Sequence, residues 1–269
     1  MRATLDELYN IFLTYRTIST DSRQIPDGCL FFALKGENFD GNVYAKNAVE
    51  KGAAYAVIDD ASFEGEKTLL VDDVLTTLQQ LALMHRRKHN IPVLAITGSN
   101  GKTTTKELIN AVLSREYRVT ATRGNFNNHI GVPLTLLQIT ADTELAIIEM
   151  GANHQGEIAQ LCTFAEPTHG MITNIGKAHL DGFGGYQGVI KAKSELYAWL
   201  RNTGGQVFVN AGNELLTELT TGMNRILYGS DQSAFCRGTA GTNSEMLVIQ
   251  WYSNDGPIHI QTQLVGNYN

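Results

Sequence analysis

The sequence contains little cysteine: only Cys29, Cys162 and Cys236 occur among its 269 residues, and none belongs to a C-x-x-C pair. An odd, sparse and widely spaced set of cysteines argues against a disulfide framework and is typical of proteins from a reducing cytoplasm. We therefore expect a cytoplasmic protein with buried, unpaired thiols.

The chain also lacks a long apolar run and a targeting segment. No stretch approaches the roughly 20 apolar residues that a membrane-spanning helix needs. The first eight residues follow a helical pattern with acidic side chains, and they have neither the apolar core nor the small-residue cleavage site of a signal peptide. We expect no membrane partner.

Positive charge is not in excess. The chain has 21 Lys and Arg against 27 Asp and Glu, for a net charge of -6. This balance argues against a nucleic-acid surface and makes any affinity for phosphate a local property. The hydrophobic content of 43% and charged content of 18% are ordinary for soluble globular proteins. The length suggests roughly two domains, and we expect a monomer.

The first of these domains spans residues 1–87 in our interpretation and is a small α/β unit. An amphipathic helix begins near Leu5, and buried strands are predicted at 30–34, 54–58 and 68–71. A further helix is predicted over 74–90. It ends in basic residues, which complement a helix C-terminus and indicate a helix end rather than a binding patch.

The second domain spans residues 88–269 and alternates apolar strands with helical stretches. Strands are predicted at 91–97, 145–149, 170–174, 206–210 and 225–228. Such alternation predicts an α/β fold with a mostly parallel sheet and helices on both faces. Two apolar stretches, 246–252 and 258–264, flank a Ser-Asn-Asp-Gly-Pro turn and predict a β-hairpin tail.

A phosphate-binding loop is predicted where the first of these strands ends. The strand runs into Thr97-Gly-Ser-Asn-Gly-Lys-Thr103 and then into a helical pattern. Glycines let backbone N–H groups approach phosphate oxygens, and the following helix N-terminus adds a favourable dipole. Lys102 is positioned to reach the outer phosphates, and the Thr103 hydroxyl to ligate Mg²⁺.

The loop is shorter than the usual G-x-x-x-x-G-K-[ST] motif, because Ile96 stands where that motif has its first glycine. A chance match is the alternative in a chain with 26 glycines. The strand before the loop and the apolar face after it favour a nucleotide site. We expect Leu108, Ile109, Val112 and Leu113 to form the buried face of that helix.

Three further residues are candidates because they follow strand ends or lie on the next helix. In an open α/β sheet, ligands bind at the carboxyl ends of the strands. Glu149 closes an apolar strand and is a candidate Mg²⁺ ligand, the alternative being a solvated strand-end carboxylate. His179 falls in a glycine-rich loop, where a packed or surface histidine is the alternative. Lys193 lies on a helix and, on sequence logic alone, is a solvated charge.

A dense polar loop, residues 122–133, lies between the phosphate loop and Glu149. It contains Arg123, Asn125, Asn127 and Asn128 among glycines. Asn and Gly suit turns, and polar loops of this kind also carry substrate contacts. The residues themselves leave both interpretations open.

Taken together, these motifs resemble the Mur ligase family of peptidoglycan synthesis over almost the whole chain. The resemblance is carried by Thr20-Asp-Ser-Arg23, Gly28–Gly36, Thr97–Thr103, Gly124–Pro133, Glu149–Ile158, Ala178–Gly184 and Lys191–Glu195. It implies a UDP-binding first domain and an ATP-binding central domain. It also implies an ATP-dependent ligase that joins D-Ala-D-Ala to UDP-MurNAc-tripeptide through an acyl phosphate.

The resemblance also implies a role for each site residue. The ATP phosphates would be bound by Gly98, Ser99, Asn100, Gly101, Lys102, Thr103 and Thr104. The UDP-linked substrate would be bound by Asp21, Ser22, Arg23, Lys35, Gly36, Asn125, Asn127 and Asn128. Two Mg²⁺ ions would be bound by Thr103, Glu149, His179 and Lys193. Lys193 would carry a carbamate, and Lys102, Glu149, His179 and Lys193 would be the catalytic residues.

The chain departs from the family pattern at its end. Leu264–Asn269 reaches the segment G-x-H-N-x-x-N that leads into a third family domain and stops there, with Tyr268 where histidine is usual. We therefore expect an N-terminal and central fragment that does not turn over alone. Two alternatives stay open: another amide ligase of the superfamily, either the third-residue ligase or a folylpolyglutamate synthase-like enzyme, and a non-catalytic nucleotide-binding module.

Overall fold

The computed structural model describes residues 2–177, 180–243 and 246–265. The chain forms two compact units: Met1–Asn90 together with His129–Asp142, and Ile91–Asn128 together with Thr143–Asn269. The expected limits of the functional domains, 1–87 and 88–269, stay a prediction.

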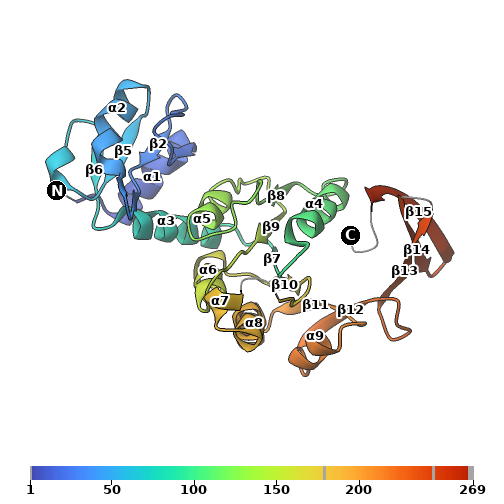
Figure 1. Cartoon of the computed structure of the whole chain (residues 1–269). Helices are drawn as coiled ribbons and strands as arrows, with labels where there is room; N and C mark the ends of the chain where they lie inside the picture. Colours follow the sequence, from blue (N-terminus) through green and yellow to red (C-terminus); the bar gives the residue numbers. More distant parts are fainter. Residues whose placement is uncertain (1, 178–179, 244–245, 266–269) are drawn as a thin grey trace. The chain divides into compact units, whose positions relative to one another are not determined.

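The first unit contains a four-stranded parallel sheet in the order β1-β2-β5-β6 (Figure 1). Its strands are β1 (Ile18–Ser19), β2 (Leu30–Phe32), β5 (Tyr55–Ile58) and β6 (Thr68–Leu70). A two-stranded hairpin, β3 (Lys35–Gly36) and β4 (Phe39–Asp40), follows β2. The helices are α1 (Leu5–Tyr15), η1 (Gly41–Tyr44), α2 (Ala45–Glu50), η2 (Ala61–Phe63) and α3 (Val74–Lys88).

Local sequence sets the ends of these helices. Thr4 and Glu7 form a reciprocal capping box at the start of α1, which satisfies two otherwise unpaired amides. At the end of α3, the Nη1 atom of Arg86 donates to the carbonyl of His89 at 2.7 Å. The basic run is therefore a helix end, as predicted.

A short segment from the middle of the chain, His129–Asp142, belongs to the first unit. It contains α5 (Gly131–Leu136), which packs against α3. The buried ring of His85 on α3 joins it through Nε2, which is 2.7 Å from the carbonyl oxygen of Ile139. Sequence patterns gave no sign of this association, because it depends on a contact between residues 54 positions apart.

The second unit is built on a nine-stranded sheet in the order β15-β14-β13-β12-β11-β10-β7-β9-β8. Neighbours are parallel from β8 to β13, and β13, β14 and β15 are antiparallel. The parallel strands before β13 are β7 (Val93–Thr97), β8 (Val119–Ala121), β9 (Leu145–Glu149), β10 (His169–Ile172), β11 (Gln206–Asn210) and β12 (Asn224–Gly229). The last three strands are β13 (Cys236–Asn243), β14 (Met246–Ser253) and β15 (Gly256–Val265).

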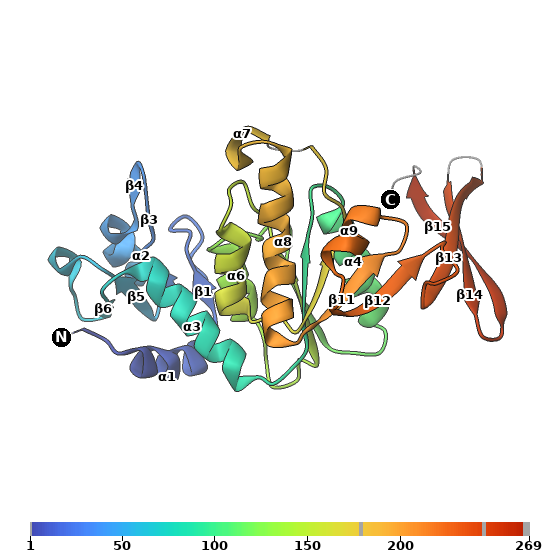
Figure 2. The same cartoon turned by 90° about the horizontal axis from the view of Figure 1, so that it is seen from below.

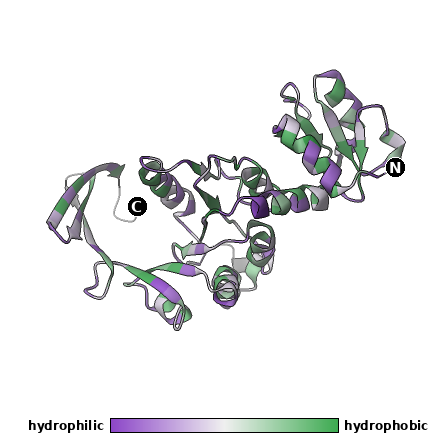
Figure 3. Ribbon diagram, turned by 180° about the vertical axis from the view of Figure 1, so that it is seen from behind, coloured by the Kyte–Doolittle hydropathy of each residue, from purple (hydrophilic) through white to green (hydrophobic). Residues whose placement is uncertain are grey.

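Helices cover both faces of the central strands. Figures 1 and 2 show α6 and α8 on one face and α4 on the other. The helices of this unit are α4 (Lys102–Leu113), α6 (Glu157–Ala165), α7 (Leu180–Phe183), α8 (Tyr186–Thr203) and α9 (Glu214–Leu219). Figure 3 shows hydrophobic residues on the central strands and mixed stripes on the helices. The predicted α/β class, mostly parallel sheet and terminal hairpin are confirmed.

Two details differ from the predictions. Leu108 and Val112, expected on the buried face of α4, are 41% and 69% exposed, and the fully buried side chain of this helix is Lys106. Cys29 and Cys162 are buried as expected, but Cys236 is exposed.

Within the described part of the chain, the helices are all too short or too polar to span a bilayer.

Candidate functional site

The phosphate loop follows β7 and needs glycine at two positions. Gly98 has φ +146°, and a Cβ there would lie 2.0 Å from the Thr173 hydroxyl oxygen, so no larger residue fits. Gly101 has φ +77° and caps the N-terminus of α4. Both positions use the freedom of glycine to adopt positive φ. The loop therefore has the strand, glycine turn and helix that the sequence predicted.

Only part of the loop backbone is open to a ligand in this conformation. The amides of Ser99 and Asn100 donate to the carbonyl and side-chain oxygens of Asn174, at 3.0 and 3.2 Å. The amides of Gly101–Thr104 lie at the start of α4, where a helix has no intrahelical acceptors. First-turn amides without acceptors, together with the helix dipole, are suited to an anion, so this end of the loop is the candidate phosphate site.

Lys102 curls back over this loop. Its Nζ donates to the carbonyl of Gly98 at 2.9 Å and to that of Ser99 at 3.4 Å. Burial lowers its pKa, and the Glu149 carboxylate opposes that shift. An ammonium held at the mouth of a phosphate loop is placed to exchange these carbonyls for phosphate oxygens.

Glu149 at the end of β9 is 1% exposed and lies beside the loop. Its Oε1 accepts from the Asn127 side-chain amide at 2.8 Å and from the Thr103 hydroxyl at 3.2 Å. Its Oε2 is buried and accepts no hydrogen bond. A buried carboxylate oxygen without a donor, next to a hydroxyl, fits the oxygen ligands that Mg²⁺ prefers.

Lys193 on α8 is not the solvated lysine that sequence logic alone suggested. It is 3% exposed, its Nζ is 3.5 Å from the carbonyl oxygen of Ala152, and it lies 5.3 Å from the centre of the Phe183 ring. Burial lowers its pKa to about 8, and the charge of Lys102 contributes to the same shift. The structure therefore brings Lys193 within electrostatic reach of the phosphate loop.

The remaining metal candidate, His179, lies outside the described residues. Among the residues that are described, no three His, Cys, Asp or Glu side chains gather into a group able to hold a metal. The fit to a cation therefore rests on Glu149 and Thr103.

The part of the polar loop that belongs to the second unit, residues 122–128, contacts Glu149, and we call it the asparagine loop. Asn127 donates to Glu149, and its own carbonyl accepts from the Gly151 amide at 2.8 Å. Asn125 accepts from the Asn127 amide at 2.7 Å through its backbone carbonyl. Asn125, Asn127 and Asn128 belong to this unit, whereas the other predicted UDP residues belong to the first.

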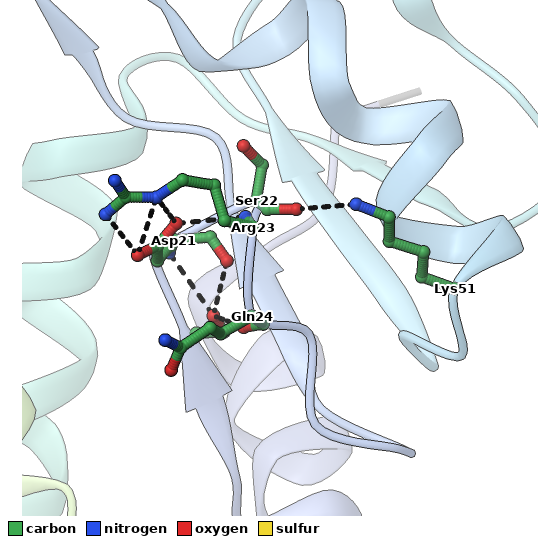
Figure 4. Close-up of polar contacts among 6 residues, drawn as sticks. Asp21, Ser22, Arg23, Gln24 and Lys51 are labelled. Atoms are coloured by element: carbon green, nitrogen blue, oxygen red, sulfur yellow. Dashed lines mark hydrogen bonds and ion pairs between the residues drawn. The ribbon is translucent and has the colours of Figure 1, made fainter.

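In the first unit, Asp21 and Arg23 form an exposed ion pair (Figure 4). The guanidinium donates from Nε and Nη2 to both carboxylate oxygens, and these bonds lower the pKa of Asp21 to about 2. Lys51 fixes the neighbouring backbone by donating to the Ser22 carbonyl at 3.0 Å.

A pocket opens beside this pair. It is lined by Thr20, Asp21, Ser22, Arg23, Phe39 and Tyr44. Phe39 and Tyr44 stack with ring centres 5.8 Å apart, and both are exposed. Neither aromatic residue was predicted from the sequence, although their position just after the Lys35–Gly36 segment was a usable signal.

Lys35 and Gly36 lie on the β3–β4 hairpin and do not line this pocket. The Lys35 ammonium instead pairs with the buried Asp59 carboxylate at 2.7 Å. The structure thus brings Asp21, Ser22 and Arg23 together, and it places Lys35 in a separate ion pair within the same unit.

Comparisons with known proteins agree with this geometry. The model of the Mur ligase middle domain matches residues 96–269, and that of the Mur ligase family catalytic domain matches residues 14–93. UDP-N-acetylmuramoyl-tripeptide–D-alanyl-D-alanine ligase of Bacillus subtilis (strain 168) is 43% identical over 217 residues, covering 79% of this chain and 47% of that protein. The enzyme of the same name from Haemophilus influenzae is 39% identical over 261 residues, covering 94% and 56%.

Solved structures are similar too. A crystal structure of MurF from Acinetobacter baumannii aligns with a TM-score of 0.83 at 33% identity, covering 94% of this chain and 56% of that one. MurF ligase from Thermotoga maritima in complex with ADP aligns with a TM-score of 0.80 at 26% identity, covering 93% and 58%. The chain spans about half the length of the curated relatives it matches.

Proposed function

Because the chain belongs to the Mur ligase family, we propose that it is the nucleotide- and UDP-binding part of an ATP-dependent peptide ligase. The substrates are UDP-MurNAc-tripeptide, ATP and D-Ala-D-Ala. This proposal is supported by the curated relatives that carry this activity in their names.

In the proposed reaction, the terminal carboxylate of the tripeptide attacks the γ-phosphate of ATP and releases ADP. The neutral amine of D-Ala-D-Ala then attacks the acyl carbon, phosphate leaves with the bonding electrons, and the nitrogen loses a proton to water as the peptide bond forms. The amides of Gly101–Thr104 and the Lys102 ammonium bind the phosphates in this scheme.

Thr103 and Glu149 would hold Mg²⁺ through the hydroxyl and the carboxylate Oε2. The ion would neutralise charge between the γ-phosphate and the attacking carboxylate. We propose a second Mg²⁺ held by His179 and Lys193. An ammonium has no acceptor for a cation, so Lys193 would bind as a carbamate, formed when its neutral amine adds CO₂ and loses a proton.

In the first unit, the pocket beside Asp21–Arg23 would take the UDP moiety. Arg23 has donors for phosphate or ribose oxygens, and the Phe39–Tyr44 pair offers an aromatic surface to the base. Asn125, Asn127 and Asn128 would face the substrate peptide. We further propose that the protein is a cytoplasmic monomer.

The observation that carries the nucleotide assignment is the buried, donor-free Oε2 of Glu149 beside the phosphate loop. The test is calorimetric titration of this chain with Mg·ATP and Mg·ADP. Lys102→Ala should abolish binding while circular dichroism stays unchanged. Lys191→Ala, an exposed lysine of α8, is the matched control. Equal Mg·ATP affinity in parent and Lys102→Ala would refute the assignment.

The same chain separates the alternatives. UDP-MurNAc-tripeptide should raise its melting temperature, and GTP should not, because a ligand stabilises only the fold that binds it. A response to the dipeptide-linked substrate of another superfamily ligase would favour that enzyme. A response to nucleotides alone would favour the non-catalytic module.

A further inference from the structure

The phosphate-loop helix carries a buried cation that the proposed reaction does not use. Lys106 lies one turn after Lys102 on α4, and its side chain is 0% exposed. Its Nζ donates to the carbonyls of Thr122 at 2.7 Å and Gly124 at 3.3 Å, and it pairs with the Glu107 carboxylate at 2.8 Å. These acceptors match the three donors of an ammonium, which is the condition for burying one.

Two of these acceptors begin the loop that reaches Glu149. Thr122 also accepts the Glu149 amide on its hydroxyl oxygen at 3.0 Å. A few residues further along, the Asn127 side chain donates to Glu149 Oε1. Lys106 therefore ties the phosphate-loop helix to the start of the loop, residues 122–124, from which the chain continues to Asn127 and its contact with Glu149.

The orientation of the Glu149 carboxylate follows from these contacts. Asn127 and Thr103 both use Oε1, and this leaves Oε2 without a hydrogen bond at 3.9 Å from Lys106 Nζ. We propose that Lys106 is a positioning residue for the divalent cation: it holds residues 122–124 so that Asn127 engages Oε1 and Oε2 stays open for the ion. This inference rests on the proposed nucleotide function.

Removing Lys106 has two effects of opposite sign. Loss of its charge favours a cation near Oε2, and loss of its hydrogen bonds releases the loop that carries Asn127. The ammonium is closer to the Glu107 carboxylate, at 2.8 Å, than to Oε2, at 3.9 Å. Glu107 therefore offsets much of its field at Oε2, and the loss of the loop contacts dominates.

The test measures ADP binding to this chain by calorimetry across a range of Mg²⁺ concentrations and in EDTA. In Lys106→Met, the Mg²⁺ concentration needed for half-maximal binding should rise about 10–100-fold, the usual effect of losing a group that orients a metal ligand. ADP affinity in EDTA should not change, because Lys102 and the loop amides remain. A general structural defect would lower both affinities. Lys191→Met, which makes the same change at an exposed lysine of α8, is the control and should change neither.

A double-mutant cycle of Lys106→Met and Asn127→Ala tests whether Lys106 changes the Mg²⁺ requirement through Asn127. If Lys106 acts through the asparagine loop, Lys106→Met should add little to the Mg²⁺ requirement of Asn127→Ala. Additive effects would overturn the proposal. Should Lys106→Met fail to fold, Lys106→Gln keeps one donor for Thr122 without the charge and enters the same cycle.

The two hypotheses fail in different ways. A parent chain that binds no ADP under any condition refutes the proposed function itself. A parent with Mg²⁺-dependent binding, together with a Lys106→Met variant of unchanged Mg²⁺ requirement, refutes only the positioning role.

Discussion

The side-chain amide of Asn174 forms hydrogen bonds with both the backbone N–H and the backbone carbonyl of Asn100. Its Oδ1 accepts from the Asn100 amide at 3.2 Å, and its Nδ2 donates to the Asn100 carbonyl at 3.0 Å. The hydroxyl of Thr173 donates to the same carbonyl at 2.6 Å. The loop that follows β10 thus braces the phosphate loop, and we expect this brace to keep the first-turn amides of α4 ready for an anion.

The first prediction concerns this brace. Asn174→Ala should weaken ADP binding about ten-fold, because two hydrogen bonds that order the loop are lost. Asn210→Ala is the matched control: it removes an asparagine at the end of β11, whose Oδ1 accepts from the Gly212 amide of its own turn at 2.9 Å. Calorimetric affinities equal in all three proteins would show that the brace does not matter for the nucleotide.

A second prediction concerns the exposed Asp21–Arg23 pair. Arg23→Ala should weaken the binding of UDP about ten-fold or more, since charge-assisted hydrogen bonds are the strong ones. The affinity of the same variant for ADP should be unchanged. Asp21→Asn leaves the guanidinium in place and provides the comparison. Tight UDP binding by Arg23→Ala, measured by fluorescence or calorimetry, would place the UDP site elsewhere.

A third prediction concerns an interhelical cap. Glu195 on α8 accepts from the amides of Gly156 at 2.6 Å and Ala159 at 2.9 Å, which caps the N-terminus of α6. Glu195→Ala should lower the free energy of unfolding of the second unit by about 1–2 kcal/mol, the range of a lost helix cap. Glu195→Gln keeps one acceptor, so its free energy of unfolding should lie between those of the parent and of Glu195→Ala. Chemical unfolding measures the series, and an undiminished stability of the alanine variant would contradict it.

The sequence predicted the fold well where local patterns decide it. The strand at Leu145–Glu149 and that at Gln206–Asn210 were predicted with their exact bounds, because short apolar runs between turn residues specify buried strands. The phosphate loop was predicted for the same reason, since its glycines and its strand–helix context are all local. The hairpin tail also follows from its turn residues.

Features that depend on distant partners were missed. The pattern on α4 marked Leu108 and Val112 as core residues, and it could not reveal that carbonyls from another loop bury Lys106 instead. In the same way, only the fold shows that Asn127 meets Glu149. Lys193 was a site candidate only through the family resemblance, because a lysine on a helix carries no sign of its own burial, and its role stays a prediction.

A final prediction concerns the pH dependence of the first unit, which follows from His85. The Nε2 of this buried ring is 2.7 Å from the carbonyl oxygen of Ile139, so Nε2 carries the hydrogen, and Nδ1, 3.1 Å from the Tyr9 hydroxyl, accepts from it. Burial lowers the pKa of His85 from 6.5 to about 4. Between these values the unfolded chain binds a proton that the folded chain does not. Stability therefore falls as pH drops through this window, by about 3 kcal/mol once the pH is below the folded pKa.

Hydrogen exchange of the α3 amides between pH 7 and pH 4 measures this loss within the first unit. His85→Gln is the comparison, because glutamine donates and accepts but does not titrate, whereas His89 and Arg16 remain in both proteins. The parent should lose more protection than the variant as the pH falls, and the difference should develop between about pH 6.5 and pH 4. Parallel curves for the two proteins would mean that His85 is protonated in the folded state at no cost, and that the pH dependence of this unit arises from other groups.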